Sequence, residues 1–173
     1  IKAAGITAIQ NSQTRYTAVN GTPEMKEAIQ SKFKRDNGLQ YAMNQILVSS
    51  GGKHSFFNLF QAILNDRDAV IIPAHYWVTY PDMSLLPGGE PVIIEAGIEQ
   101  GFKITATQLE EAITPKTKIM VVNSPSNPTG AVYTADELKS LADVLVKYPN
   151  IIIASDDMYE HIMISDMPFT NIL

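Results

Sequence analysis

The segment 118-KIMVVNSPSNPTG-130 places a run of apolar residues directly before a polar turn that contains two prolines. Comparable runs occur along the chain, and we expect strands at 46–50, 69–73, 91–95, 118–122 and 150–155. Helix-like stretches lie between them, at 53–65, 77–86, 106–113 and 134–147. Strands that are apolar at nearly every position are buried on both faces. The sequence therefore predicts a three-layer α/β/α protein, in which helices cover both faces of a mostly parallel sheet.

Two further helices are expected in the first part of the chain. Residues 2–10 are rich in alanine and isoleucine. The segment 22-TPE-24 offers a capping hydroxyl, a proline at the first helical position and an acid in the first turn, which is typical of a helix start. This second helix is expected to end near Asn37-Gly38. Farther along, Thr134 and Glu137 have the spacing of a capping box at the start of a helix.

The composition is that of a soluble globular protein, with 45% hydrophobic and 18% charged residues in a chain of 173. The absence of cysteine excludes disulfides and thiolate metal sites and fits a cytoplasmic protein. A formal net charge of -5 argues against a nucleic-acid surface. No apolar run reaches the roughly 18 residues that a membrane span needs. His54, His75 and His161 lack the spacing of paired metal ligands, so we expect no metal site.

In parallel sheets ligands bind at the carboxyl ends of the strands, so the loops that follow the expected strands form the candidate site. Gly51-Gly52 leads into a helix that begins near Lys53. Glycine lets the backbone approach a ligand closely, and the free N–H groups of a helix N-terminus attract an anion such as a phosphate. A simple tight turn explains the two glycines equally well. The spacings of the P-loop and dinucleotide-binding motifs are both absent.

Four side chains near the other strand ends could surround a flat ligand. Trp77, the only tryptophan, could stack on a ring, although a packing role is the simpler alternative. Asp156 follows an apolar run, where a carboxylate needs a protein cation, backbone donors or a protonated ring nitrogen as its partner. Tyr159 could donate its hydroxyl to the same ligand or pack in the core. Asn127 precedes Pro128, which restricts the backbone of Asn127 and could direct its side-chain amide toward the carboxyl edge of the sheet. The alternative is that the segment is only a proline-rich turn.

Taken together, the motifs resemble those of a known family. Four segments carry the resemblance: SSGGKHSFFNLFQAIL (49–64), AHYWVTYPDM (74–83), NSPSNPTG (123–130) and DDMYEH (156–161). They are similar to the fold-type I, class I pyridoxal-phosphate aminotransferases, and most of all to the bacterial aspartate aminotransferase branch. The similarity covers nearly the whole chain, and the ordered set of motifs is highly specific, whereas each motif alone is not.

The resemblance implies a role for residues at the phosphate end of the cofactor, pyridoxal 5'-phosphate. The backbone of Gly52 and Lys53 would hold the phosphate. Tyr16 looks like the tyrosine that reaches the phosphate of the neighbouring subunit, which implies a homodimer.

The resemblance also implies roles around the pyridine ring. Trp77 would stack on the ring and border the substrate site. Asn127 would bind the 3′ oxygen of the ring and contact the carboxylate of the substrate. Tyr159 would donate to the same 3′ oxygen. Asp156 would pair with the ring nitrogen and keep it protonated.

One departure from the family pattern concerns the catalytic lysine, which forms a Schiff base with the cofactor. In the family it lies downstream of the DxxY motif, and here no lysine follows Lys147, so by the resemblance it lies beyond Leu173. We therefore expect residues 1–173 to be part of the large, cofactor-binding domain, without the catalytic lysine and the small domain, and to be inactive alone.

The full-length protein would then transfer the amino group of an amino acid such as aspartate to a 2-oxo acid, 2-oxoglutarate. Two alternatives stay within the fold type: an aromatic or broad-specificity aminotransferase, and a relative that eliminates rather than transfers. A third alternative is a non-catalytic α/β ligand-binding domain. That third alternative would be favoured if Trp77, Asn127, Asp156 and Tyr159 were scattered more than about 15 Å apart instead of surrounding one ligand-sized gap.

Overall fold

The computed structural model describes residues 1–164 and 166–173. The chain forms two compact units, Ile1–Ser49 and Ser50–Leu173. The second unit carries the expected sheet. Its elements are α3 (Gly52–Ile63), β1 (Ala69–Pro73), α4 (Thr79–Leu85), β2 (Glu90–Ile94), η3 (Ile98–Gln100), α5 (Ala106–Ala112), β3 (Thr117–Asn123), α6 (Ala135–Leu145) and β4 (Ile152–Asp156). That both units are parts of one large domain stays a prediction.

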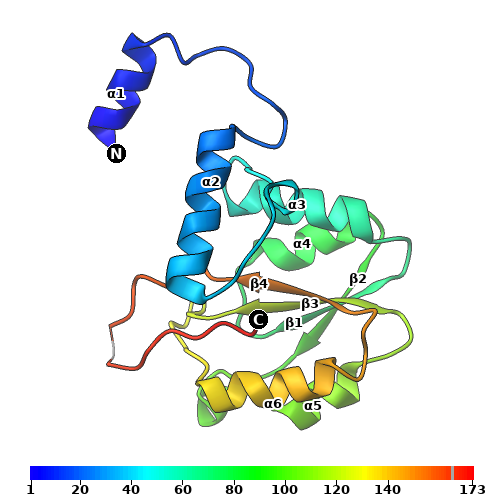
Figure 1. Ribbon diagram of the computed structural model, residues 1–173. Helices are drawn as coiled ribbons and strands as arrows, with labels where there is room; N and C mark the ends of the chain where they lie inside the picture. The colour runs from blue at the N-terminus through cyan, green and yellow to red at the C-terminus, as the bar shows by residue number, and fades with distance from the viewer. Residues whose placement is uncertain (165) are drawn as a thin grey trace. The chain divides into compact units, whose positions relative to one another are not determined.

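The sheet has four parallel strands in the order β2-β1-β3-β4. Helices α3 and α4 cover one face, and α5 and α6 cover the other (Figure 1). This arrangement confirms the predicted α/β fold with three layers.

Successive side chains of the inner strands explain why both faces are covered. Val70 and Ile72 of β1 pack in the core cluster that contains Phe60 of α3, whereas Ile71 packs in the cluster that contains Leu141 of α6. Strand β3 alternates in the same way between the two clusters. Because side chains along a strand point alternately to opposite faces, a run without polar residues supplies a core to both layers of helices.

The expected strand at 46–50 is wrong. This run follows the short helix η2 (Met43–Gln45) and has irregular backbone. The main-chain N–H of Val48 donates to the carbonyl of Asn20 at 3.2 Å, in the loop before α2, and Leu47 is 57% exposed. A strand exists only through hydrogen bonds to a neighbouring strand, and an apolar run by itself does not supply that neighbour.

The first unit contains α1 (Lys2–Gln10) and α2 (Pro23–Lys32), and α2 continues into the π-helix η1 (Phe33–Asn37). The side chain of Thr22 caps α2 by accepting a hydrogen bond from the main-chain N–H of Met25 at 3.3 Å. Gly38 ends the helical segment in the left-handed conformation, with φ 71°. The predicted start and end of this helix are therefore confirmed.

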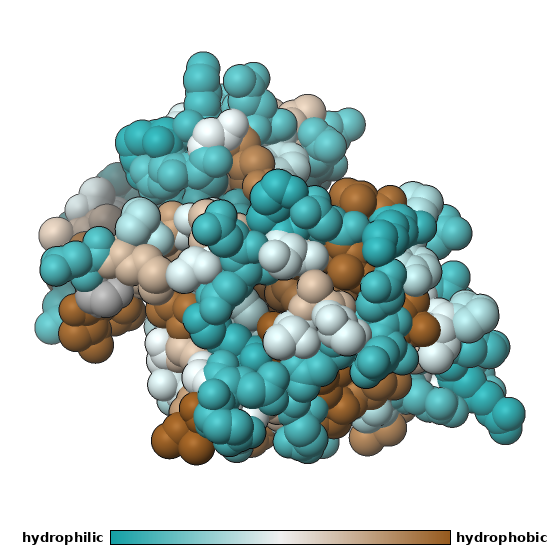
Figure 2. Space-filling model, turned by 90° about the horizontal axis from the view of Figure 1, so that it is seen from below, coloured by the Kyte–Doolittle hydropathy of each residue, from teal (hydrophilic) through white to brown (hydrophobic). Residues whose placement is uncertain are grey.

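Helix α6 shows how the outer layer is held. Thr134 and Glu137 form the predicted capping box at its start, and the helix buries Leu138 and Leu141 against the sheet. Its outward side carries an ion pair between Lys139 and Asp143 at 2.6 Å. Seen from the side of α5 and α6, the surface is largely hydrophilic, with hydrophobic side chains in separate patches (Figure 2). None of the helices in the described residues is both long and apolar enough to cross a membrane.

Candidate functional site

The order of the strands determines where a ligand can bind. Strand β2 lies on one side of β1, and β3 lies on the other side. The direction in which successive strands are added to the sheet therefore reverses between β1 and β3. In open α/β sheets the crevice at such a reversal, beyond the carboxyl ends of the strands, is the usual ligand site. A cavity of about 270 Å³ lies there. Its lining comprises Gly51, Gly52, Lys53, Trp77, Tyr80, Asn123, Asn127, Asp156, Met158 and Tyr159.

The cavity brings together most of the residues that the sequence singled out. Gly52 and Lys53 come from the start of α3, Trp77 from the loop after β1, Asn127 from the loop after β3, and Asp156 and Tyr159 from the end of β4 and the turn that follows. Their roles toward a cofactor stay predictions. Tyr16 belongs to the first unit and is fully exposed, so its predicted role also stays open to test.

The start of α3 depends on one glycine. Gly51 has φ 88° and ψ 168°, a backbone region that is almost restricted to glycine. This conformation turns the chain into α3, whose first N–H groups have no acceptor within the helix. These donors and the ammonium group of Lys53 make one end of the cavity suitable for an anion.

We expect Gly51→Ala to lower the free energy of unfolding by about 1–3 kcal/mol, because alanine strongly disfavours this backbone region. Gly52→Ala is the matched control, since neither added Cβ would meet another atom within 4 Å and Gly52 lies outside the left-handed region. The control should be neutral or stabilising by up to about 1 kcal/mol, because alanine favours a helix more than glycine does. Urea denaturation measures both variants, and equal losses would contradict the argument from backbone strain.

Aromatic side chains form one wall of the cavity. The rings of Trp77 and Tyr80 meet edge to face, with their centroids 5.4 Å apart. The ammonium nitrogen of Lys53 lies 5.2 Å from the centroid of the Trp77 ring. The indole therefore lies between a buried tyrosine and a cation, next to the open volume of the cavity.

The carboxylate of Asp156 is held by two donors. The hydroxyl of Tyr80 donates to its Oδ2 at 2.5 Å, and the main-chain N–H of Met158 donates to its Oδ1 at 3.2 Å. Burial raises the pKa of Tyr80, and the neighbouring carboxylate raises it further, so this hydroxyl stays protonated and acts as a donor. Asp156 itself is only partly buried and borders the cavity, where a cationic ligand atom could reach it.

The polar turn after β3 is closed by its own hydrogen bonds. The N–H of Gly130 donates to the carbonyl of Ser126 at 2.8 Å, and the N–H of Ser126 donates to the carbonyl of Ala131 at 2.9 Å. At the start of the turn, the side-chain oxygen of Asn123 accepts from the N–H of Asn127 at 2.8 Å. The peptide bonds before Pro125 and Pro128 are both cis.

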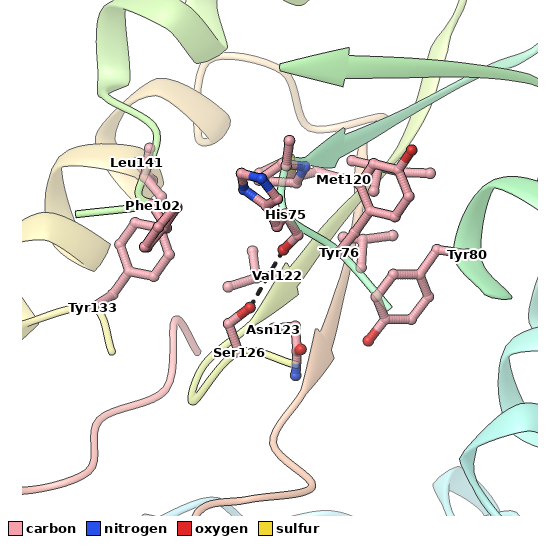
Figure 3. Close-up of a pocket in the computed structure, with 14 residues that line it drawn as sticks. His75, Tyr76, Tyr80, Phe102, Met120, Val122, Asn123, Ser126, Tyr133 and Leu141 are labelled. Atoms are coloured by element: carbon pink, nitrogen blue, oxygen red, sulfur yellow. Dashed lines mark hydrogen bonds between the residues drawn. The ribbon is translucent and has the colours of Figure 1, made fainter. Parts of the chain in front are cut away.

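A second, much smaller cavity of about 20 Å³ lies among the carboxyl ends of the strands. Figure 3 shows its lining, including the hydrogen bond of 3.4 Å from the hydroxyl of Ser126 to the carbonyl of His75. It has room for about one water molecule and not for an organic ligand. Tyr80 and Asn123 line this small cavity and also the large one.

The chemistry of the large cavity fits a flat, phosphorylated, cationic ring. It offers an anion site at a helix N-terminus, an aromatic wall, amide and phenol donors and a carboxylate that can face a cation. This fold and lining are typical of an α/β domain that binds such a ligand at the switch point of its sheet. The chain belongs to the class I and II aminotransferases, because the model of that family matches residues 1–173. Members of this family typically depend on pyridoxal phosphate.

Individual relatives agree with the family assignment. The chain is 60% identical over 173 residues to the aspartate/prephenate aminotransferase of Nitrosomonas europaea, covering 100% of this chain and 44% of that protein. The crystal structure of an aspartate aminotransferase from Rhizobium meliloti matches with a TM-score of 0.96 and 45% identity, over 98% of this chain and 42% of that one.

A further solved structure, an aromatic aminotransferase from Pyrococcus horikoshii, matches with a TM-score of 0.94 and 34% identity, over 99% of this chain and 46% of that one. The chain thus spans less than half the length of these relatives. The predicted resemblance to the aspartate aminotransferase branch is confirmed.

Proposed function

We propose that the chain is the cofactor-binding part of a pyridoxal-phosphate aminotransferase that, at full length, transfers the amino group of aspartate to 2-oxoglutarate. The observation that supports this most is the convergence of residues from four separate segments on one cavity at the switch point of the sheet. The names of the similar proteins from Nitrosomonas and Rhizobium support aspartate as the amino donor.

Different residues of the cavity would contact different parts of the cofactor. The backbone of Gly52 and Lys53 would hold the phosphate, and Trp77 would pack on the ring. Asp156 would face the ring nitrogen, where a carboxylate favours the protonated form. When bound, pyridoxal phosphate supplies an electron sink for the electrons released at the α-carbon of an amino acid.

Two further side chains would orient the ring and the substrate. Asn127 and Tyr159 would donate hydrogen bonds to the 3′ oxygen. Asn127 would also contact the carboxylate of the substrate, and Trp77 would border the substrate site. We further propose that the full-length protein is a homodimer, in which Tyr16 of each subunit reaches the cofactor phosphate of the other.

The proposal includes the inactivity of the 173-residue chain on its own. Among the described residues Lys53 is the lysine that lines the cavity, and we assign this residue, at the start of α3, to phosphate binding rather than to proton transfer at a substrate. We therefore expect non-covalent binding of the cofactor. Borohydride reduction followed by peptide mapping, run beside a transamination assay, tests this. A reduced lysine adduct accompanied by turnover would contradict it.

Cofactor binding can be measured through Trp77, the only tryptophan. Pyridoxal phosphate should quench its fluorescence in a saturable manner, because the cofactor would lie against the indole. Pyridoxal, which lacks the phosphate, should bind at least about 10-fold more weakly, since it loses charge-assisted hydrogen bonds. Quenching that does not saturate, or that is equal for both compounds, would overturn the proposed site.

An aromatic aminotransferase is the second candidate function. The likeness to the Pyrococcus horikoshii enzyme supports it, since the fold is matched nearly as well as in the aspartate enzyme. A panel of amino donors tested on the full-length protein separates the two. A higher kcat/KM for phenylalanine or tyrosine than for aspartate would favour the second candidate, and prephenate should be included among the acceptors because a relative is named for it.

A further inference from the structure

We propose that Asn123 is a positioning residue that fixes Asn127 and Asp156 relative to each other, so that these two groups meet the cofactor as one unit. The inference rests on the proposed function of the cavity. It assigns a role to a residue of the cavity lining whose side chain is hydrogen-bonded to the main chain of both groups.

The geometry places Asn123 between the two groups. Asn123 is the last residue of β3 and stands opposite Asp156, the last residue of β4, in the parallel pairing of the strands. Its side-chain nitrogen donates to the main-chain carbonyl of Asp156 at 2.8 Å, and its side-chain oxygen accepts from the main-chain N–H of Asn127 at 2.8 Å. Both distances are those of well-formed hydrogen bonds.

The position needs an amide because it needs a donor and an acceptor at once. Aspartate would keep the acceptor for Asn127 but could not donate to a carbonyl, and an apolar residue would offer neither. The bond to Asp156 holds the main chain of that residue, while Tyr80 and the N–H of Met158 hold its carboxylate. Asp156 is therefore fixed at both its backbone and its side chain, and the main chain of Asn127 is held by the same Asn123 side chain.

A purely structural role is the competing explanation, in which Asn123 only strengthens the edge between β3 and β4. Two measurements separate the roles. One is the affinity for pyridoxal phosphate, followed by fluorescence. The other is the circular dichroism of the bound cofactor at saturation, which reports how the ring is held and does not depend on the stability of the fold.

The variants are Asn123→Ala and Asn123→Asp, with Asn150→Ala as the matched control, because Asn150 is an exposed turn residue before β4. Asn123→Ala should lower the affinity about 10-fold, as expected for two lost hydrogen bonds. It should also change the circular dichroism of the bound cofactor. In this background Asp156→Asn should cost less affinity than in the unmodified chain, because coupled residues are not additive. Unchanged dichroism or additive losses would overturn the proposal.

Hydrogen exchange of the ligand-free chain tests the same arrangement without the cofactor. The N–H of Asn127 should be protected in the unmodified chain, in Asn123→Asp and in Asn150→Ala, and should exchange faster in Asn123→Ala. An N–H of Asn127 that exchanges equally fast in all four proteins would overturn the positioning role. Failure of the unmodified chain to bind pyridoxal phosphate would instead count against the proposed function, so the two results are distinguishable.

Discussion

Replacing Asp156 with asparagine is expected to weaken the binding of pyridoxal phosphate about 10- to 100-fold, because a hydrogen bond to a charged partner contributes about 1.5–3 kcal/mol. Asparagine has nearly the same shape as aspartate, but it carries no charge to face a protonated ring nitrogen. It also offers one oxygen where Asp156 offers two, and those oxygens accept from Tyr80 and from the N–H of Met158. Titration of the fluorescence of Trp77 measures the change.

The adjacent carboxylate provides the control for this result. Asp157 is half-buried and accepts a hydrogen bond from Ser155 at 2.6 Å, and among the described residues it is not part of the cavity lining. Burial raises the pKa of Asp157, so its neutral replacement is easily accommodated. Asp157→Asn should change the affinity by no more than about twofold. Equal losses in the two variants would point to a general effect of negative charge and not to a specific partner for the ring nitrogen.

The sequence predicted the central part of the fold because the relevant signal was local. The runs that became β1 and β3 are apolar at successive positions, which indicates burial on both faces, and these two inner strands are buried, whereas the edge strand β4 is mostly half-buried. The capping residues Thr22 and Thr134 marked where helices begin. Once the strands were parallel, their carboxyl ends had to lie at one edge. The convergence of Trp77, Asn127 and Asp156 on one cavity follows from that topology.

Other features depend on contacts that a sequence pattern does not contain. The run at 46–50 resembles a strand, but its backbone meets the loop at Asn20 instead of a neighbouring strand. Asn123 was not singled out, although it opens the same polar turn as Asn127 and ends an apolar strand. Tyr80 lies in the segment 74–83 that carries the resemblance, but no role was predicted for it, and its bond to Asp156 joins residues 76 positions apart. A polar residue at the end of a buried strand, and a tyrosine one helical turn after a predicted ring-stacking residue, are the signals that would have found them.

The second large effect, a loss of stability, is expected for substitution of Tyr80, whose ring lies in the core and whose hydroxyl contacts the candidate site. Its side chain is 1% exposed and packs against Phe56 and Trp77, while its hydroxyl donates to Asp156. Tyr80→Ala should lower the free energy of unfolding by about 3–5 kcal/mol, as expected when a large buried ring is removed. This is a large fraction of the roughly 5–15 kcal/mol that stabilises a typical domain. Urea denaturation with a check for an unchanged m-value measures it.

Tyr80→Phe separates the hydroxyl from the ring. It keeps the contacts with Phe56 and Trp77, so its loss of stability should stay within the about 1.5–3 kcal/mol of one hydrogen bond to a charged group. Its affinity for pyridoxal phosphate should nevertheless fall several-fold, because the carboxylate of Asp156 loses the donor that orients it. Tyr148→Phe, on the opposite side of the sheet, serves as the control and should leave the affinity unchanged. If Tyr80→Phe binds the cofactor as tightly as the unmodified chain, then the orientation of Asp156 comes from its backbone contacts alone, and Tyr80 serves only the core.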